Sequence, residues 1–156
     1  MDRPAAITRF ERLWWGSMAL SGLGSLLSWD RVRASIEERF AQDPRLRGQE
    51  VASVVADWAQ WTGVAMLLAW TLLVWYLVAR RASPVGKWLG VATAVLSGVQ
   101  LLILVAGLLA GRTLHPLSQA SAAGAGLLAI AAAAALFRPD ARRWFGEPAD
   151  DEEGTI

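Results

Sequence analysis

Four long apolar segments without a single Asp, Glu, Lys or Arg constrain this chain more than any other feature. They cover residues 13–29, 58–79, 88–111 and 114–137. A helix rises about 1.5 Å per residue, so about 20 residues cross the roughly 30 Å of a bilayer's hydrocarbon. Backbone polar groups in hydrocarbon need partners within the protein, which helices provide. We therefore expect an all-α polytopic membrane protein, one domain with four transmembrane helices.

The composition agrees with this class. Hydrophobic residues make up 54% of the 156 residues, and with the 14 glycines the apolar share is about 63%, above the usual 45–50%. The net charge of +1 argues against a nucleic-acid partner. The absence of cysteine excludes disulfides, thiol chemistry and cysteine metal sites, and a single histidine argues against histidine-rich metal sites.

The first segment has only 17 residues and follows arginines, as a signal peptide would. However, no small-x-small cleavage pattern follows it, and Glu11 lies in the supposed basic region. We therefore expect the segment to be retained as a span.

The connecting segments predict the orientation. The connection at 80–87 carries three cations and no acid, whereas the one at 111–113 carries a single arginine. Cytoplasmic loops are enriched in Lys and Arg. We therefore expect a bacterial plasma-membrane protein with both termini in the cytoplasm.

Nine tryptophans fit this layout, because the indole ring favours the headgroup boundary. Those expected to anchor the helices at the two boundaries are Trp14, Trp15, Trp29, Trp58, Trp61, Trp88 and Trp144.

Two further segments lie outside the predicted spans. Residues 30–43 are predicted to form a short amphipathic helix that starts at Asp30 as its N-cap and covers the outer end of the bundle; the alternative is a docking surface for a partner. The acidic residues 147–156 are predicted to be disordered, either solvated or bound to a partner with a basic face.

Small residues recur at helical spacing on the predicted spans, as expected where membrane helices pack closely. Those singled out as packing positions are Ser17, Ser21, Ser25, Gly90, Gly98 and Gly126. A lining for a hydrated path is the alternative role of the same faces.

Intramembrane polar groups point to binding or transport when they occur. Gln100, near the middle of its span, is expected to hydrogen-bond to another helix, with a role in substrate binding as the alternative. Asp57 shares a face with Gln60 near the outer boundary, where it either pairs with an arginine or binds a proton or cation. His115 is either incidental or a pH sensor.

No pattern of catalytic groups accompanies these residues. The sequence shows no nucleophile beside a base, no inward carboxylate pair, no phosphate loop and no metal-ligand cluster. We therefore expect no enzymatic activity, no cofactor and no metal.

Three stretches resemble those of small four-span integral membrane proteins of actinobacteria. They are LWWGSMALSGLGSLLSW, GKWLGVATAVLSGV and LFRPDARRWF, and the similarity covers most of residues 7–145. The resemblance implies four spans but no particular activity.

The sequence favours a non-catalytic accessory or assembly subunit that packs, within the lipid, against other membrane proteins or against itself. The alternative is a small homo-oligomeric transporter or channel; a third possibility is an envelope sensor. Geometry separates the first two, because a polar cavity that reaches mid-membrane favours transport and a flat small-residue face favours a subunit.

Overall fold

The computed structural model describes residues 3–42, 51–111 and 116–147, with side chains at 51 and 52 left out. Five helices and no strand occur within these ranges. The helices are α1 (Ala5–Gln42), α2 (Val51–Ala79), α3 (Pro84–Leu109), α4 (Pro116–Ala135) and α5 (Pro139–Trp144).

Three of these helices are long and apolar enough to cross a membrane: Ser53–Ala79, Pro84–Leu109 and Pro116–Ala135. They correspond to the predicted spans at 58–79, 88–111 and 114–137, so the predictions of an all-helical fold and of these three apolar helices of membrane-spanning length are confirmed. The predicted first span at 13–29 is not among the three, because its tryptophans, serines and glycines lower its hydropathy.

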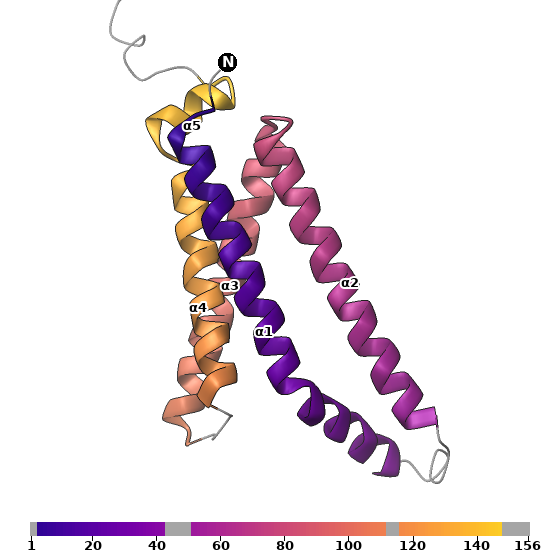
Figure 1. Cartoon of the computed structure of the whole chain (residues 1–156). Coiled ribbons are helices and arrows are strands. Elements are labelled where there is room, and N and C mark those ends of the chain that lie inside the picture. The colour runs from indigo at the N-terminus through magenta and orange to yellow at the C-terminus, as the bar shows by residue number, and fades with distance from the viewer. Residues whose placement is uncertain (1–2, 43–50, 112–115, 148–156) are drawn as a thin grey trace, which may run out of the picture.

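The predicted first span and the predicted separate helix at 30–43 form one continuous helix, α1, of 38 residues. At about 1.5 Å per residue it is about 57 Å long. Asp30 lies inside this helix and does not cap a new one. Several serines of α1 donate to carbonyls one turn earlier, a bond that accommodates local bending. Figure 1 shows the last part of α1 turning toward α2.

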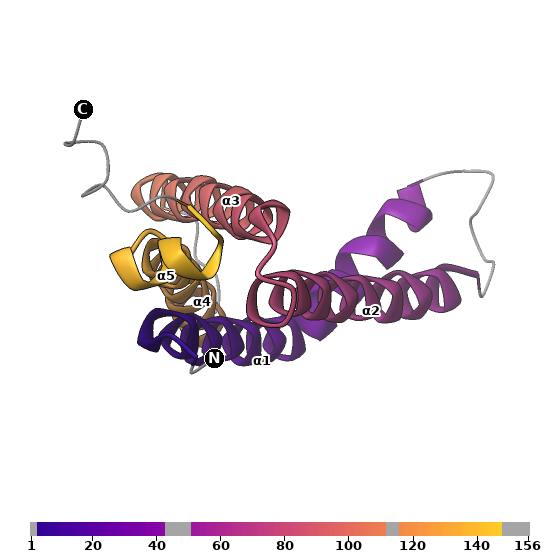
Figure 2. The same ribbon diagram turned by 90° about the horizontal axis from the view of Figure 1, so that it is seen from above.

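The four long helices pack as antiparallel neighbours. α1 lies along α4, α4 lies beside α3, and α2 packs against both α1 and α3. α2 stays near α3 only around their connecting turn and then diverges from it (Figures 1 and 2). We call the end that holds the start of α1, the α2–α3 turn and α5 the closed end, and the other the open end.

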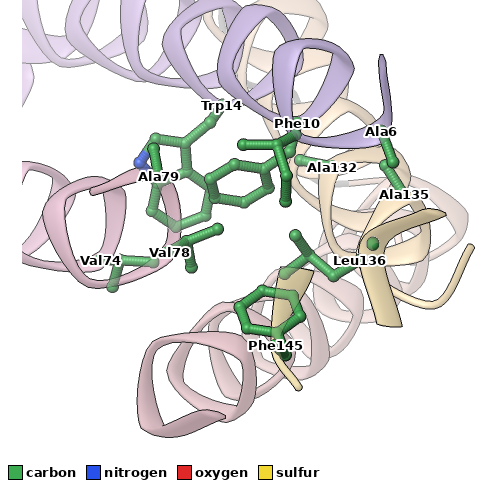
Figure 3. Packing of buried hydrophobic residues seen from close by; sticks show 12 residues of the cluster. Ala6, Phe10, Trp14, Val74, Val78, Ala79, Ala132, Ala135, Leu136 and Phe145 are labelled. Atoms are coloured by element: carbon green, nitrogen blue, oxygen red, sulfur yellow. The ribbon is translucent and has the colours of Figure 1, made fainter. Parts of the chain in front are cut away.

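The hydrophobic core lies at the closed end (Figure 3). Its largest fully buried side chains are Phe10, Ile7, Leu136, Val74 and Val78. The cluster joins α1, α2 and α4 and extends to Phe145, just after α5. Lipid tails are as apolar as these side chains, so the hydrophobic effect adds little where the cluster lies within the bilayer. Van der Waals packing stabilises the cluster there.

Two indole rings tie α2 into the closed end. The Trp14 Nε1–H donates to the carbonyl of Thr71 at 3.1 Å, and the Trp144 Nε1–H donates to the carbonyl of Val78 at 2.9 Å. Trp14 is only 4% exposed. It therefore packs among the helices of the closed end, and its depth in the bilayer stays a prediction.

Polar contacts fix the two terminal segments to the same end. The backbone N–H of Ala6 donates to the carboxylate of Asp140 at 2.8 Å, which satisfies a free donor at the start of α1. Arg3 pairs with Glu11 at 2.9 Å and also donates to the carbonyl of Ala79. These contacts bring the start of α1, the end of α2 and α5 together.

The turn between α2 and α3 is tight. An added Cβ at Gly86 would lie 2.6 Å from the Cβ of Leu77, so only glycine fits there. Ala82 has a φ of 47°, in the left-handed region that L residues other than glycine rarely adopt. Pro84 begins α3 at a position where its missing N–H costs no helical bond.

Candidate ligand-binding hollow

A hollow of about 680 Å³ occupies the open half of the bundle. Side chains of α1, α3 and α4 surround it, and Leu67 of α2 completes the wall. Its lining consists of Ser17, Ser21, Gly24, Ser25, Ser28, Arg31, Val32, Ser35, Leu67, Ser97, Gln100, Ser118, Ala122, Ala125 and Gly126. Its volume falls within the roughly 300–1,000 Å³ typical of small-molecule sites.

Toward the open end, α2 lies apart from α3 (Figure 2). Close to the turn, the Trp70 Nε1–H still donates to the hydroxyl of Thr93 at 3.0 Å and ties the two helices together. Beyond this contact, Leu96 and Met66 are 64% and 69% exposed. The hollow is therefore reached both from the open end and from the side between α2 and α3.

On its other side, α2 is held to α1 at the open end. The rings of Trp29 and Trp61 meet edge to face with centroids 5.6 Å apart. Arg33 also lies 3.8 Å from the carboxylate of Asp57. These contacts keep the open end of α2 on α1, so the gap opens toward α3.

A smaller hollow of about 220 Å³ continues the first one toward the closed end. The two share five lining residues, among them Ser21, Ser97 and Gln100. The smaller one ends at Trp14 and Thr71, at the edge of the hydrophobic core. The hollows thus run from the open end to about the middle of the helices and stop at the core.

Several serines in the lining already have hydrogen-bond partners in the backbone. Ser25 donates to the carbonyl of Ser21 at 3.0 Å, and Ser28 donates to that of Gly24 at 2.8 Å. Ser17 donates across to the carbonyl of Ala125 of α4 at 2.8 Å. These serines act as small packing residues and offer little to a ligand.

Three polar side chains in the lining differ from these serines. The hydroxyls of Ser21 and Ser97 and the amide of Gln100 have no hydrogen-bond partner within the described ranges. The expected bond from Gln100 to another helix is therefore not seen there. No buried side-chain nitrogen or oxygen among the described residues lacks a partner, so the polar atoms of these three residues are accessible from the hollow. The three groups favour an occupant, water or ligand, that hydrogen-bonds to them.

Arg31 lies in the lining toward the open end and forms no ion pair within the part of the chain that the structure describes. Its neighbour Arg33 is engaged, because it donates to Glu37 at 3.1 Å and lies near Asp57. The hydrogen bond to Glu37, followed by the charge of Asp57, raises the pKa of Arg33 above its ordinary value. Arg31 is thus the cation of this hollow that remains available for an anion.

The other predicted polar residues lie outside this hollow. Asp57 pairs with Arg33, one of the two roles left open by the sequence. Gln60 lines an adjoining hollow of about 230 Å³ between α1 and α2, which shares Ser25, Ser28, Val32 and Leu67 with the first hollow. His115 lies outside the described residues.

The small residues serve two different environments. A Cβ added at Gly90 would meet Leu136 at 3.4 Å, and one at Gly126 would meet Leu101 at 3.0 Å, so these glycines pack within the chain. At Gly98 nothing lies within 4 Å. Gly90 and Gly126 therefore allow helices of this chain to approach each other closely, whereas Gly98 has no neighbouring helix against it.

The remaining predicted anchors fall at both ends of the helices. Trp58, Trp61 and Trp88 are 72%, 65% and 63% exposed. Trp15 is exposed and lies against Trp75, while Trp29 is half-buried on Trp61.

Comparison of the chain with protein-family models, curated proteins and solved structures finds no match. The hollow and its lining are therefore the basis for assigning a function. The serine spacing on α1 pointed toward this region, but the sequence offered no signal that would select Arg31.

Proposed function

We propose that this protein is a four-span membrane protein that binds a small solute in the hollow and carries it across the bilayer. The observation that carries this proposal is the group of unpaired polar side chains, Ser21, Ser97 and Gln100, in a cavity open at one end and closed at the other. A cavity that brings polar groups to the middle of the spans distinguishes transport from simple subunit packing. Transport is thus favoured over the accessory role that the sequence alone suggested.

The fourth span in this proposal is the first part of α1. Ser17 bonds to Ala125, and an added Cβ at Gly24 would lie 2.8 Å from the Ser121 hydroxyl, so α1 and α4 run together at the same depth. Where α4 crosses the membrane, the adjacent part of α1 crosses too. Its serines face the hollow, while Leu23 and Leu26 are 48% and 67% exposed toward lipid.

The core cluster at the closed end acts as the barrier in this proposal. Phe10 and Leu136 have no exposed surface, and Trp14 lines the hollow where it ends at the core. Passage to the closed end requires α2 to move relative to α1, because Trp14 bonds to the backbone of α2.

Water access to the hollow tests the first half of the proposal. Because the chain has no cysteine, Ser97→Cys introduces a single thiol, and Val95→Cys, at a 61% exposed position outside the hollow lining, is the matched control. A charged methanethiosulfonate reacts with thiolate, which forms in water and not in hydrocarbon. We expect Ser97→Cys to react at least tenfold faster; equal rates would contradict a hydrated hollow.

Flux tests the second half. Vesicles containing the purified protein are exposed to gradients of small neutral, anionic and cationic solutes, and swelling or uptake is followed. We expect one class to enter, with at least tenfold slower entry for Gln100→Leu and unchanged entry for Gln42→Leu, at the end of α1 and outside the lining of the hollow. Entry that is equal in protein-free vesicles for every class would contradict transport.

An accessory or assembly role is the second candidate, and the uncovered glycines favour it. Gly98, Gly63 and Gly22 have nothing within 4 Å, which leaves room for another helix to approach closely. A photoreactive residue at Gly98 should then form an adduct of one defined mass with a partner protein in native membranes. Adducts with lipid alone would contradict this role.

A further inference from the structure

The side opening gives the hollow a direct route from the lipid. Past the Trp70–Thr93 bond, α2 and α3 separate, and most of the lining surface of the hollow is apolar. A molecule dissolved in the bilayer can therefore enter sideways. This access favours a ligand with an alkyl chain over a fully polar solute.

Arg31 defines the polar end of such a ligand. It is the cation of the hollow without a carboxylate partner among the described residues, whereas Arg33 is held by Glu37 and Asp57. The guanidinium fork matches the paired oxygens of a carboxylate or phosphate. Trp29 and Trp61 contact each other at the same end, and indole rings favour the depth at which an amphiphile's headgroup sits.

Deeper polar groups define a second requirement. Ser21 lies ten residues before Arg31 on the same helix, about 15 Å along its axis. Ser97 and Gln100 of α3 line the hollow at the level of Ser21. A plain alkyl chain would leave these three groups without a partner, whereas an oxygen function along the chain would bond to them.

We propose that the ligand is a single-chain anionic amphiphile that carries a hydroxyl or keto group along its chain, an assignment that rests on the proposed binding function. Its acid group binds Arg31, and its chain oxygen bonds to Ser21, Ser97 or Gln100. The chain beyond this oxygen leaves between α2 and α3 toward the lipid.

Binding to the full chain in neutral detergent tests this assignment, with 12-hydroxystearate, stearate and stearyl alcohol as probes and native mass spectrometry as the readout. We expect one 12-hydroxystearate per chain, with stearate at least threefold weaker and the uncharged alcohol at least tenfold weaker. Equal affinities for the three probes would overturn the proposal.

Variants locate the site. Arg31→Gln should weaken 12-hydroxystearate binding at least tenfold, while Arg39→Gln, the same change on an arginine outside the lining, should leave it within twofold. Gln100→Leu should remove the preference for the hydroxylated chain but keep the preference for the charge. An equal effect of Arg31→Gln and Arg39→Gln would overturn the proposal.

The thiol-labelling result separates this inference from the function on which it rests. If Ser97→Cys reacts and none of the three probes binds, the hollow is hydrated and only the ligand assignment is wrong. If Ser97→Cys reacts no faster than Val95→Cys, the function itself fails.

Discussion

The ammonium of Lys87 lies 2.6 Å from the carboxylate of Glu147, across 60 residues of sequence. The Lys87 side chain is 5% exposed, and its nitrogen lies 4.8 Å from the ring centroid of Phe137 and 5.7 Å from that of Phe145. Ring faces attract a cation, so both rings add to the effect of the carboxylate. This pair holds the segment after α5 on the start of α3.

Removal of the carboxylate should therefore weaken the closed end. Glu147→Gln leaves a buried ammonium with a neutral partner, and loss of such a charge-assisted bond costs about 1.5–3 kcal/mol. We expect a lower midpoint of thermal unfolding in detergent. In a double-mutant cycle, Lys87→Met should recover part of the loss; additive effects would show that the pair contributes nothing.

The close approach of α2 and α3 makes Gly86 sensitive to any side chain. In Gly86→Ala the new Cβ would lie 2.9 Å from the Leu77 carbonyl carbon and 3.0 Å from the Val78 nitrogen, so backbone must move. Overpacking of this kind costs about 1–3 kcal/mol. Gly98→Ala is the control, because nothing lies within 4 Å of Gly98.

Circular dichroism during heating measures both glycine variants. We expect a clear loss of stability for Gly86→Ala and no loss for Gly98→Ala, whose higher helix propensity adds up to about 1 kcal/mol. Equal stability of the two variants would contradict the tight turn.

The left-handed conformation of Ala82 predicts a stabilising substitution. The left-handed conformation costs a residue with a Cβ about 1–2 kcal/mol of conformational energy. Glycine avoids this cost but loses about 0.5–1 kcal/mol more chain entropy on folding. Ala82→Gly should therefore raise the stability by about 0.5–1 kcal/mol. The matched change Ala92→Gly, within the helix α3, should lower it by a similar amount. A loss of stability in Ala82→Gly would contradict the turn geometry.

The sequence predicted those helices whose apolar character is strongest. The prediction for α2 ended at the observed residue, Ala79, and its start differed by seven residues. The predicted start of α3 at Trp88 lay four residues after the observed one, because Pro84 is an allowed first helical residue and charge does not break a helix. Hydropathy marks the lipid-embedded part of a helix and not its ends.

Other features depend on tertiary contacts that local patterns do not encode. Asp30 looked like a cap, yet α1 continues through it, because an exposed Asp costs little inside a helix. The general preference of indole for the boundary gave no sign that Trp14 is buried between helices, because that burial depends on its carbonyl partner on α2.

The candidate site was predictable in part. Serine spacing on α1 and the position of Gln100 selected residues that do line the hollow. The separation of α2 from α3, and the lack of an ion-pair partner for Arg31 among the described residues, depend on tertiary packing and had no signature in the sequence. Glu147, predicted as part of a disordered tail, instead pairs with Lys87, while residues 148–156 lie outside the described residues.

Topology mapping tests the central claim of four crossings most directly. Single cysteines are placed at Ala5, Ser83 and Gly146 for the closed end and at Ala34 and Gly111 for the open end, and intact cells are treated with an impermeant thiol reagent. The account predicts labelling at Ala34 and Gly111 in intact cells, and labelling at the other three sites only after lysis. Labelling of Ala5 and Ala34 from the same side of the membrane would contradict it.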